Sequence, residues 1–235
     1  MRTMHIARGS QRPGIDAVEG RPPSWTALLA WSGIVGPVLF TGTFVGQEIF
    51  RASEFNPLVE TVSALEAGPN GWVQQVNFVI FGLLTIAFAV GLHVGLRRTR
   101  FGLLGPALLF MSGIGLLLAA GFPLREDVAG ATYDPGGHML AGFLFFSTSA
   151  VGLIVVSSRL ARDPRWRNIA RYPLVAGVVS LVGFFAMGAL VMPDGAPLHE
   201  WAGLAQRALI VLVLFPCRVV LSHRLLRVAS GRPHS

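Results

Sequence analysis

Residues 60–72 read Glu-Thr-Val-Ser-Ala-Leu-Glu-Ala-Gly-Pro-Asn-Gly-Trp, a short polar segment between two long apolar runs. Its acids, hydroxyls and Gly-Pro-Asn-Gly turn would leave polar groups unsatisfied in a lipid bilayer. The segment therefore predicts a loop at a membrane surface. The apolar runs on either side of it are candidates for membrane spans.

The rest of the chain repeats this pattern of apolar runs and short polar connections. Each run has about 20 residues or more, and a helix rising 1.5 Å per residue then crosses a hydrocarbon core of roughly 30 Å. The predicted helices are residues 25–47, 72–96, 101–123, 138–158, 173–193 and 201–222. These runs predict an all-α membrane protein with a six-transmembrane-helix bundle over residues 25–223. Residues 1–24 are expected to form a disordered cytoplasmic tail, and residues 224–235 a second cytoplasmic tail.

The composition and the placement of charge support a membrane protein. The chain is 52% hydrophobic and 13% charged, against about 25% charged residues in soluble domains. The net charge of +7 comes from arginines in short clusters between apolar runs, which is the positive-inside pattern and not a basic face for nucleic acid. The arginine clusters alternate with acidic loops. We therefore expect a multi-pass protein of the plasma membrane with both termini cytoplasmic and the acidic loops outside.

The last predicted helix carries a charge inside the membrane region. Arg207 follows Gln206 about two turns into this helix, where a charge is costly unless it has a partner. Glu48, at the outer end of the first helix, lies at a matching depth and is the expected partner. Two interpretations stay open, a structural ion pair and a clamp for an anionic ligand. Further along, Pro216 is expected to kink the helix, and Arg218 is expected to snorkel to the inner interface.

The outer loops and helix ends supply a candidate polar pocket. Acids, hydroxyls, a histidine and the Gln-Arg pair would converge there if the bundle brings the loops together. The candidate ligand-binding residues are Glu48, Glu60, Ser63, Asp134, His138, Gln206 and Arg207.

The same end offers candidate metal ligands. Imidazole and carboxylate groups suit zinc or another divalent metal, and the candidates are His138, His199, Asp134 and Asp194. The alternative interpretation is that the two aspartates shape turns before helices and the histidines form hydrogen bonds across loops. The spacing does not match a diagnostic zinc motif, so no cofactor is the simpler expectation.

Several motifs in order resemble a known family. They are Ser63-Ala-Leu-Glu-Ala-Gly-Pro-Asn-Gly-Trp72 followed by Gly82-Leu-Leu, Gly105-Pro106, Asp134-Pro135 followed by His138, and Gly203-Leu-Ala-Gln-Arg207. Together they resemble the bacterial membrane family called domain of unknown function 998. The resemblance covers residues 31–225 and implies a six-helix integral membrane protein with no established activity. It also implies that Ser63, Asp134, His138, Gln206 and Arg207 belong to the family pattern, and His199 and Glu200 less clearly.

Two main hypotheses about function follow. The first is a non-enzymatic membrane protein that binds or transports a small molecule or lipid in the polar outer pocket. The second is a metal-dependent hydrolase embedded in the membrane and acting at the outer leaflet. A channel is a third possibility, although the chain has no filter-like segment. The expected partners are the lipid bilayer and a small-molecule or lipid ligand, without nucleic acid, and the sequence leaves the oligomeric state open.

Overall fold

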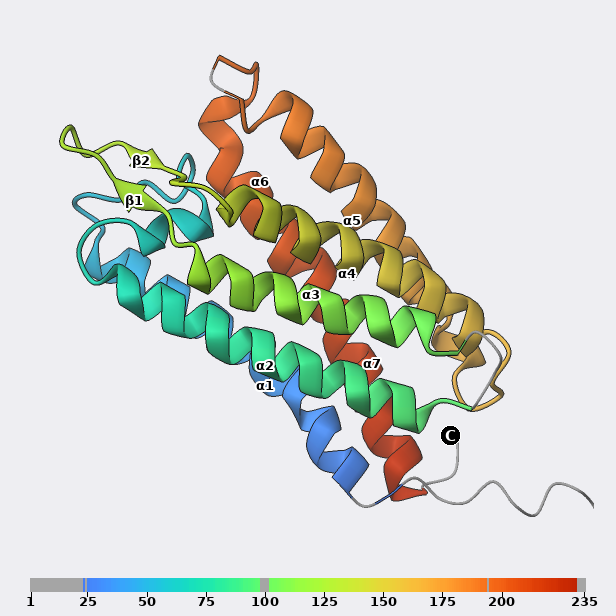
Figure 1. Ribbon diagram of the computed structural model, residues 1–235. Coiled ribbons are helices and arrows are strands. Elements are labelled where there is room, and N and C mark those ends of the chain that lie inside the picture. Colours follow the sequence, from blue (N-terminus) through green and yellow to red (C-terminus); the bar gives the residue numbers. More distant parts are fainter. Residues whose placement is uncertain (1–22, 24, 98–101, 194, 232–235) are drawn as a thin grey trace, which may run out of the picture.

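The computed structural model describes residues 23, 25–97, 102–193 and 195–231. Within them, six helices are long and apolar enough to cross a membrane, which confirms the predicted multi-pass, all-α architecture (Figure 1). The first five are α1 (Trp25–Phe50), α2 (Gly71–Gly95), α3 (Leu104–Gly121), α4 (His138–Leu160) and α5 (Arg171–Leu190), with the short η3 (Arg167–Ile169) before α5. The sixth span, His199–Ser230, consists of η4 (His199–Trp201), α6 (Ala202–Ala208), the π-helical segment η5 (Leu209–Leu214) and α7 (Phe215–Ser230).

The helices form a closed arrangement in which chain neighbours are also neighbours in space. α1 to α5 each pack against the next helix, and the sixth span starts beside α5 and ends beside α1 and α2 (Figure 1). α5 is the most peripheral span, because 28% of its most apolar stretch is buried, against 39% to 50% in the other spans. α5 is therefore the least covered of the six spans.

The two ends of the bundle differ in charge. One end, called the acidic end, carries residues 51–70, residues 122–137 and residues 191–193 and 195–198. It includes the small antiparallel ribbon of β1 (Arg125–Glu126) and β2 (Thr132–Tyr133), with Arg125 opposite Tyr133. The other, basic end carries the described arginines between α4 and α5 and those at the end of α7. There Arg159 donates to the carbonyls of Leu96 and Gly102 and so ties together the turn between α2 and α3.

The last helix is longer than the sequence predicts. Residues 224–230 were expected to begin a cytoplasmic tail, but they continue α7 to Ser230. The reason is packing: Leu225 is fully buried, and Arg224 donates to the carbonyl of Arg165 and to the side chain of Asn168. The other predicted helices agree with the observed ones to within three residues at each end. The predicted N-terminal tail lies outside the described residues apart from Pro23.

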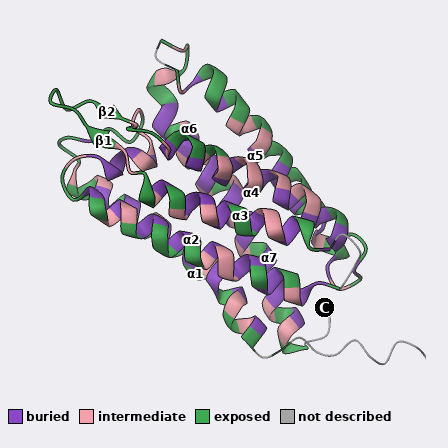
Figure 2. Ribbon diagram, viewed as in Figure 1, coloured by how far each residue is buried: buried purple, intermediate pink, exposed green. Residues whose placement is uncertain are grey.

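Phenylalanine rings fill the centre of the bundle. Phe40 contacts the rings of Phe44, Phe78, Phe81 and Phe215, with centroids 4.7–6.0 Å apart. Burial is confined to the inward faces of the helices, while large apolar side chains cover the outer surface (Figure 2). An outer surface of this kind is the expected solution when the surrounding solvent is lipid.

The residues around the opening polar segment form a folded cap on the acidic end. We call residues 55–67 the cap segment, which contains the short 3-10 helix η2 (Val62–Glu66). Phe55, Val62 and Leu65 point into the protein and are at most 4% exposed. Arg51 fastens the segment by donating to the carbonyls of Leu65 and Ala67. The stretch that looks like a solvated loop in the sequence is therefore partly core.

Candidate functional site

Arg207 forms the predicted ion pair with Glu48. Its Nε and Nη2 atoms donate to Glu48 Oε1 at 2.9 Å and 2.6 Å, and both side chains are largely buried. Nη1 donates to the main-chain carbonyl of Glu60 at 2.7 Å. The Phe55 ring lies beneath the guanidinium, with its centroid 5.8 Å away. The pair is thus a junction of α1, the cap segment and the sixth span.

The motif before Arg207 docks the sixth span onto the cap segment. The amides of Gly203 and Leu204 donate to the carbonyls of Val59 and Leu58, each at 3.0 Å. A Cβ atom on Gly203 would lie 2.3 Å from the carbonyl oxygen of Glu60, so this close approach requires glycine. Gln206 Oε1 accepts from the amide of Val62 at 2.7 Å. The amides of Gly203 and Leu204 and the side-chain oxygen of Gln206 are therefore all engaged by the main chain of the cap segment.

A second buried pair joins Glu66 to His138. Their nearest side-chain atoms, Glu66 Oε2 and His138 Nδ1, are 3.1 Å apart, and Nδ1 also contacts the carbonyl of Phe122 at 3.1 Å. Since the carbonyl of Phe122 can only accept, a hydrogen bond to it requires the hydrogen on Nδ1. Burial raises the pKa of Glu66 and outweighs the opposing effects of His138 and of the Leu124 amide. Glu66 was not among the predicted site residues, because its partner is far away in sequence and no spacing pattern links them.

Asp134 caps the start of α4. Its carboxylate accepts from the amides of Gly136, His138 and Met139 at 2.8, 3.3 and 2.9 Å. Partial burial opposes ionisation, but the three amide bonds prevail and lower the pKa of Asp134. This geometry agrees with the turn-forming interpretation of Asp134. Asp194, its counterpart in the predicted metal set, lies outside the described residues.

The remaining predicted residues are also engaged locally. The Ser63 hydroxyl lies 3.0 Å from the Thr61 hydroxyl, and its described hydrogen bonds include no histidine or carboxylate. The Glu60 carboxylate accepts from the amide of Asn56 at 2.7 Å. His199 Nδ1 contacts the carbonyl of Val191 at 3.1 Å. In the described part of the chain, no group of three or more His, Cys, Asp or Glu side chains is placed to hold a metal. The zinc hypothesis stays a prediction.

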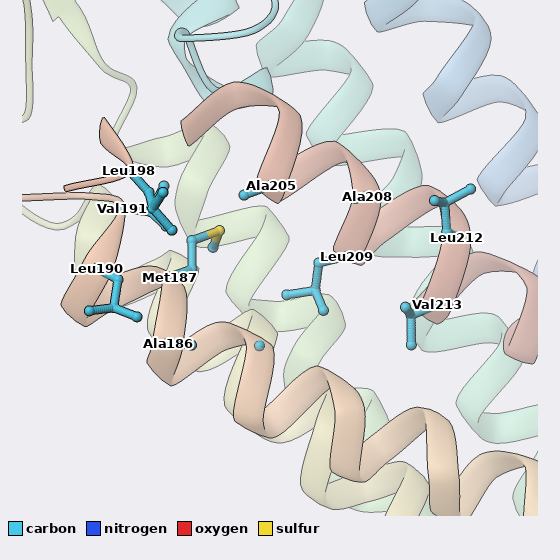
Figure 3. Close-up of a pocket in the computed structure, with 11 residues that line it drawn as sticks. Ala186, Met187, Leu190, Val191, Leu198, Ala205, Ala208, Leu209, Leu212 and Val213 are labelled. Atoms are coloured by element: carbon cyan, nitrogen blue, oxygen red, sulfur yellow. The ribbon is translucent and has the colours of Figure 1, made fainter. Parts of the chain in front are cut away.

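An apolar groove lies in the half of the bundle nearer the acidic end. It is on a different side of the sixth span from the polar contacts of Gln206 and Arg207. It is a groove of about 360 Å³ between α5 and the sixth span. Small residues form its walls, namely Gly183 and Ala186 on α5 and Ala205 and Ala208 on α6. Met187 and Leu209 extend into the space between the two helices (Figure 3). The predicted polar pocket and the groove are therefore separate features.

Comparison with known proteins adds the family. The family model described as "Protein of unknown function (DUF998)" matches residues 34–223, which is most of the chain and includes four complete spans and most of the first and the sixth. The chain belongs to the DUF998 family. Neither the curated proteins nor the solved structures gave a significant match. In this DUF998 protein, the motifs with Gly82 and Gly105 lie where α2 meets α3 and where α3 meets α4. The motif that ends at Arg207 joins the sixth span to the cap segment.

Proposed function

We propose that the protein binds the acyl chain of a membrane lipid in the groove between α5 and the sixth span. The observation that carries the proposal is the lining of the groove, which consists of glycine, alanine, valine, leucine and methionine residues. Its volume of about 360 Å³ falls at the lower end of the roughly 300–1,000 Å³ of small-molecule sites. An apolar groove facing the bilayer selects an alkyl chain because it offers no hydrogen-bond partner.

The length of the groove suits one leaflet. Its α5 wall runs from Gly183 to Leu190 and ends at Val191, which corresponds to about 12 Å at 1.5 Å per residue. The hydrocarbon of one leaflet is about 15 Å thick, half of a core of roughly 30 Å. One acyl chain lying along the helices would therefore fill the groove.

The groove lies in the half of the bundle nearer the acidic end. The positive-inside rule orients the basic end toward the cytoplasm, so the proposed ligand is a lipid of the outer leaflet of the plasma membrane. The polar residues of the acidic end support this function indirectly. The Arg207–Glu48 pair and the Gln206 contact hold the start of the sixth span in place, and this start forms one wall of the groove.

Native mass spectrometry of the purified protein tests the proposal. The variants Ala208→Trp and Ala186→Trp place a large ring in the groove, and we expect each to lose a retained phospholipid that the wild type carries. The control is Val38→Trp on α1, a lipid-facing position that is 64% exposed and lies outside the groove. Its lipid count is expected to equal that of the wild type.

Photo-crosslinking with a phospholipid that carries a diazirine in its acyl chain gives an independent measurement. We expect crosslinks to concentrate on the groove residues of α5 and the sixth span. The same lipid count in all four proteins, with crosslinks spread evenly over the lipid-facing surface, would show that the groove is not a binding site.

A further inference from the structure

Arg218 lies inside the bundle, and 8% of its surface is exposed. Arg224, which contacts Arg165 and Asn168 at the basic end, is six residues further on, so Arg218 lies about 9 Å deeper along the helix. The expectation that Arg218 snorkels to the interface is therefore wrong. The side chain instead packs inward against α2, where aromatic rings surround it.

Three side chains of α2 hold the guanidinium. Nη1 donates to Thr85 Oγ1 at 2.7 Å, and the central guanidinium carbon lies 4.9 Å from the ring centroids of both Phe81 and Phe88. These α2 residues are four and three positions apart, so they share one helix face. Cation–π contacts of this kind offset part of the cost of burying the charge, but they do not neutralise it.

The chain supplies Arg218 with no counter-charge among the described residues. Its Nε and Nη2 atoms are buried and have no hydrogen-bond partner there. The described parts of the six spans contain two acidic residues, Glu48 and Glu200. Both belong to the acidic end, and Glu48 is already paired with Arg207. A buried charge without a counter-charge is destabilising, and a bound anion would offset this cost.

A second unsatisfied donor lies close to Arg218. Ser222, one turn beyond Arg218 on α7, has a fully buried hydroxyl without a hydrogen-bond partner in the described chain. The Ser222 hydroxyl and the Phe88 ring both lie against Gly33. Guanidinium and hydroxyl donors without a carboxylate are the chemistry that recognises an anion.

The helix is irregular just before Arg218. The π-helical segment η5 ends at Leu214, and Pro216, which has no N–H to donate, is two residues before Arg218. The helix type thus changes just before Pro216, while the kink expected there stays a prediction. Short π-helical stretches occur often at functional sites, and interrupted helices near the bilayer midplane form the ion sites of transporters.

From these observations we infer that Arg218 binds a small monovalent anion between α2 and α7, either a halide or the carboxylate of a small acid. The anion accepts N–H bonds from Nε and Nη2 while Nη1 stays on Thr85. This site is independent of the lipid groove, because it rests on other residues and on charge.

Thermal unfolding in detergent at constant ionic strength tests the site with sodium chloride and sodium acetate as separate probes. We expect at least one anion to raise the Tm of the wild type by a few degrees in a saturable manner, and the comparison of the two distinguishes halide from carboxylate. Arg218→Met should abolish the rise. The matched control Arg227→Met removes an exposed arginine of the same helix and should keep it. A wild type without a saturable response, or an equal response in Arg218→Met, overturns the inference.

A second measurement covers the case in which Arg218→Met fails to fold. Wild-type crystals grown with sodium bromide, or soaked in it, are examined by anomalous diffraction. A bromide peak within hydrogen-bond distance of the Arg218 guanidinium supports a halide site. A map without this peak, together with no acetate response of the wild-type Tm, overturns the inference.

Discussion

Arg207 and Glu48 are 159 residues apart in the sequence, yet Glu48 Oε1 accepts two hydrogen bonds from the Arg207 guanidinium, at 2.9 Å and 2.6 Å. The third hydrogen bond of Arg207 goes to the carbonyl of Glu60. One side chain therefore connects the first span, the cap segment and the last span. This junction closes the ring of helices at the acidic end.

Removing one charge of this pair is expected to destabilise the protein more than removing both charges. Arg207→Leu leaves the Glu48 charge buried and unpaired, and such changes cost about 3–5 kcal/mol. The double variant Glu48→Leu/Arg207→Leu removes both charges and should be more stable than Arg207→Leu alone. Thermal unfolding followed by circular dichroism measures both effects. If Arg207→Leu unfolds like the surface variant Arg227→Leu, the pair has no structural role. Normal stability with loss of a bound ligand would favour the anion clamp.

Gly203→Ala is expected to loosen the cap segment. The new Cβ would lie 2.3 Å and 2.5 Å from the carbonyl oxygens of Glu60 and Pro57, and main-chain atoms cannot move aside cheaply. We expect a loss of roughly 1–3 kcal/mol, as for overpacked cores. The matched control is Gly188→Ala on α5, where a Cβ meets nothing within 4 Å. That change should stabilise the helix by up to about 1 kcal/mol, so a similar Tm for the two variants would contradict the docking geometry.

Acid should weaken the protein partly through Asp134. Because the pKa of Asp134 is lowered in the folded state, its contribution is fully present above the ordinary value of 3.8. The contribution is lost as the pH falls through the folded-state pKa. Asp134→Asn keeps an acceptor oxygen without the charge, so this part of the acid dependence should disappear. The comparison is made with Tm measured from pH 6 to pH 3. Parallel curves for the two proteins would exclude the capping role.

Glu66 should have the opposite effect on the pH dependence of stability. Its pKa is raised by burial, so its contribution to stability is fully present below the ordinary value of 4.5 and is lost as the pH rises through the folded-state pKa. Glu66→Gln removes this titration and should change the pH dependence of Tm above pH 4.5. The partly exposed Glu126→Gln is the control. A Glu66→Gln curve that overlays the wild type would show that Glu66 does not titrate in this range.

The structure separates residues whose roles were predictable from those whose roles were not. The Glu48–Arg207 pair was predictable because a charge inside a span needs a partner at the same depth. The capping by Asp134 follows from its position just before a helix. The Glu66–His138 pair was missed, since it depends on how the cap segment folds against the ribbon and α4. Arg218 was misjudged because hydropathy alone does not say which face of a helix points inward.

The packing of small residues also could not be predicted from the sequence. Gly42-x-x-x-Gly46 and Gly91-x-x-x-Gly95 look alike in sequence and both suggest close helix contact. A Cβ on Gly42 or Gly46 would meet nothing within 4 Å, whereas one on Gly91 would lie 2.8 Å from Leu29 and one on Gly95 would lie 2.1 Å from Leu225. One motif therefore packs and the other does not, and only the neighbouring helix decides which.

By itself, the sequence determined the six spans, the segregation of charge between the two ends and the family, because bilayer thickness and the cost of burying charge act on local runs of residues. The tertiary structure alone decided that the polar segment at residues 60–72 is a partly buried cap, that the open groove is apolar, and that Arg218 faces the interior. These features depend on which helix faces meet, and such contacts join residues far apart along the chain.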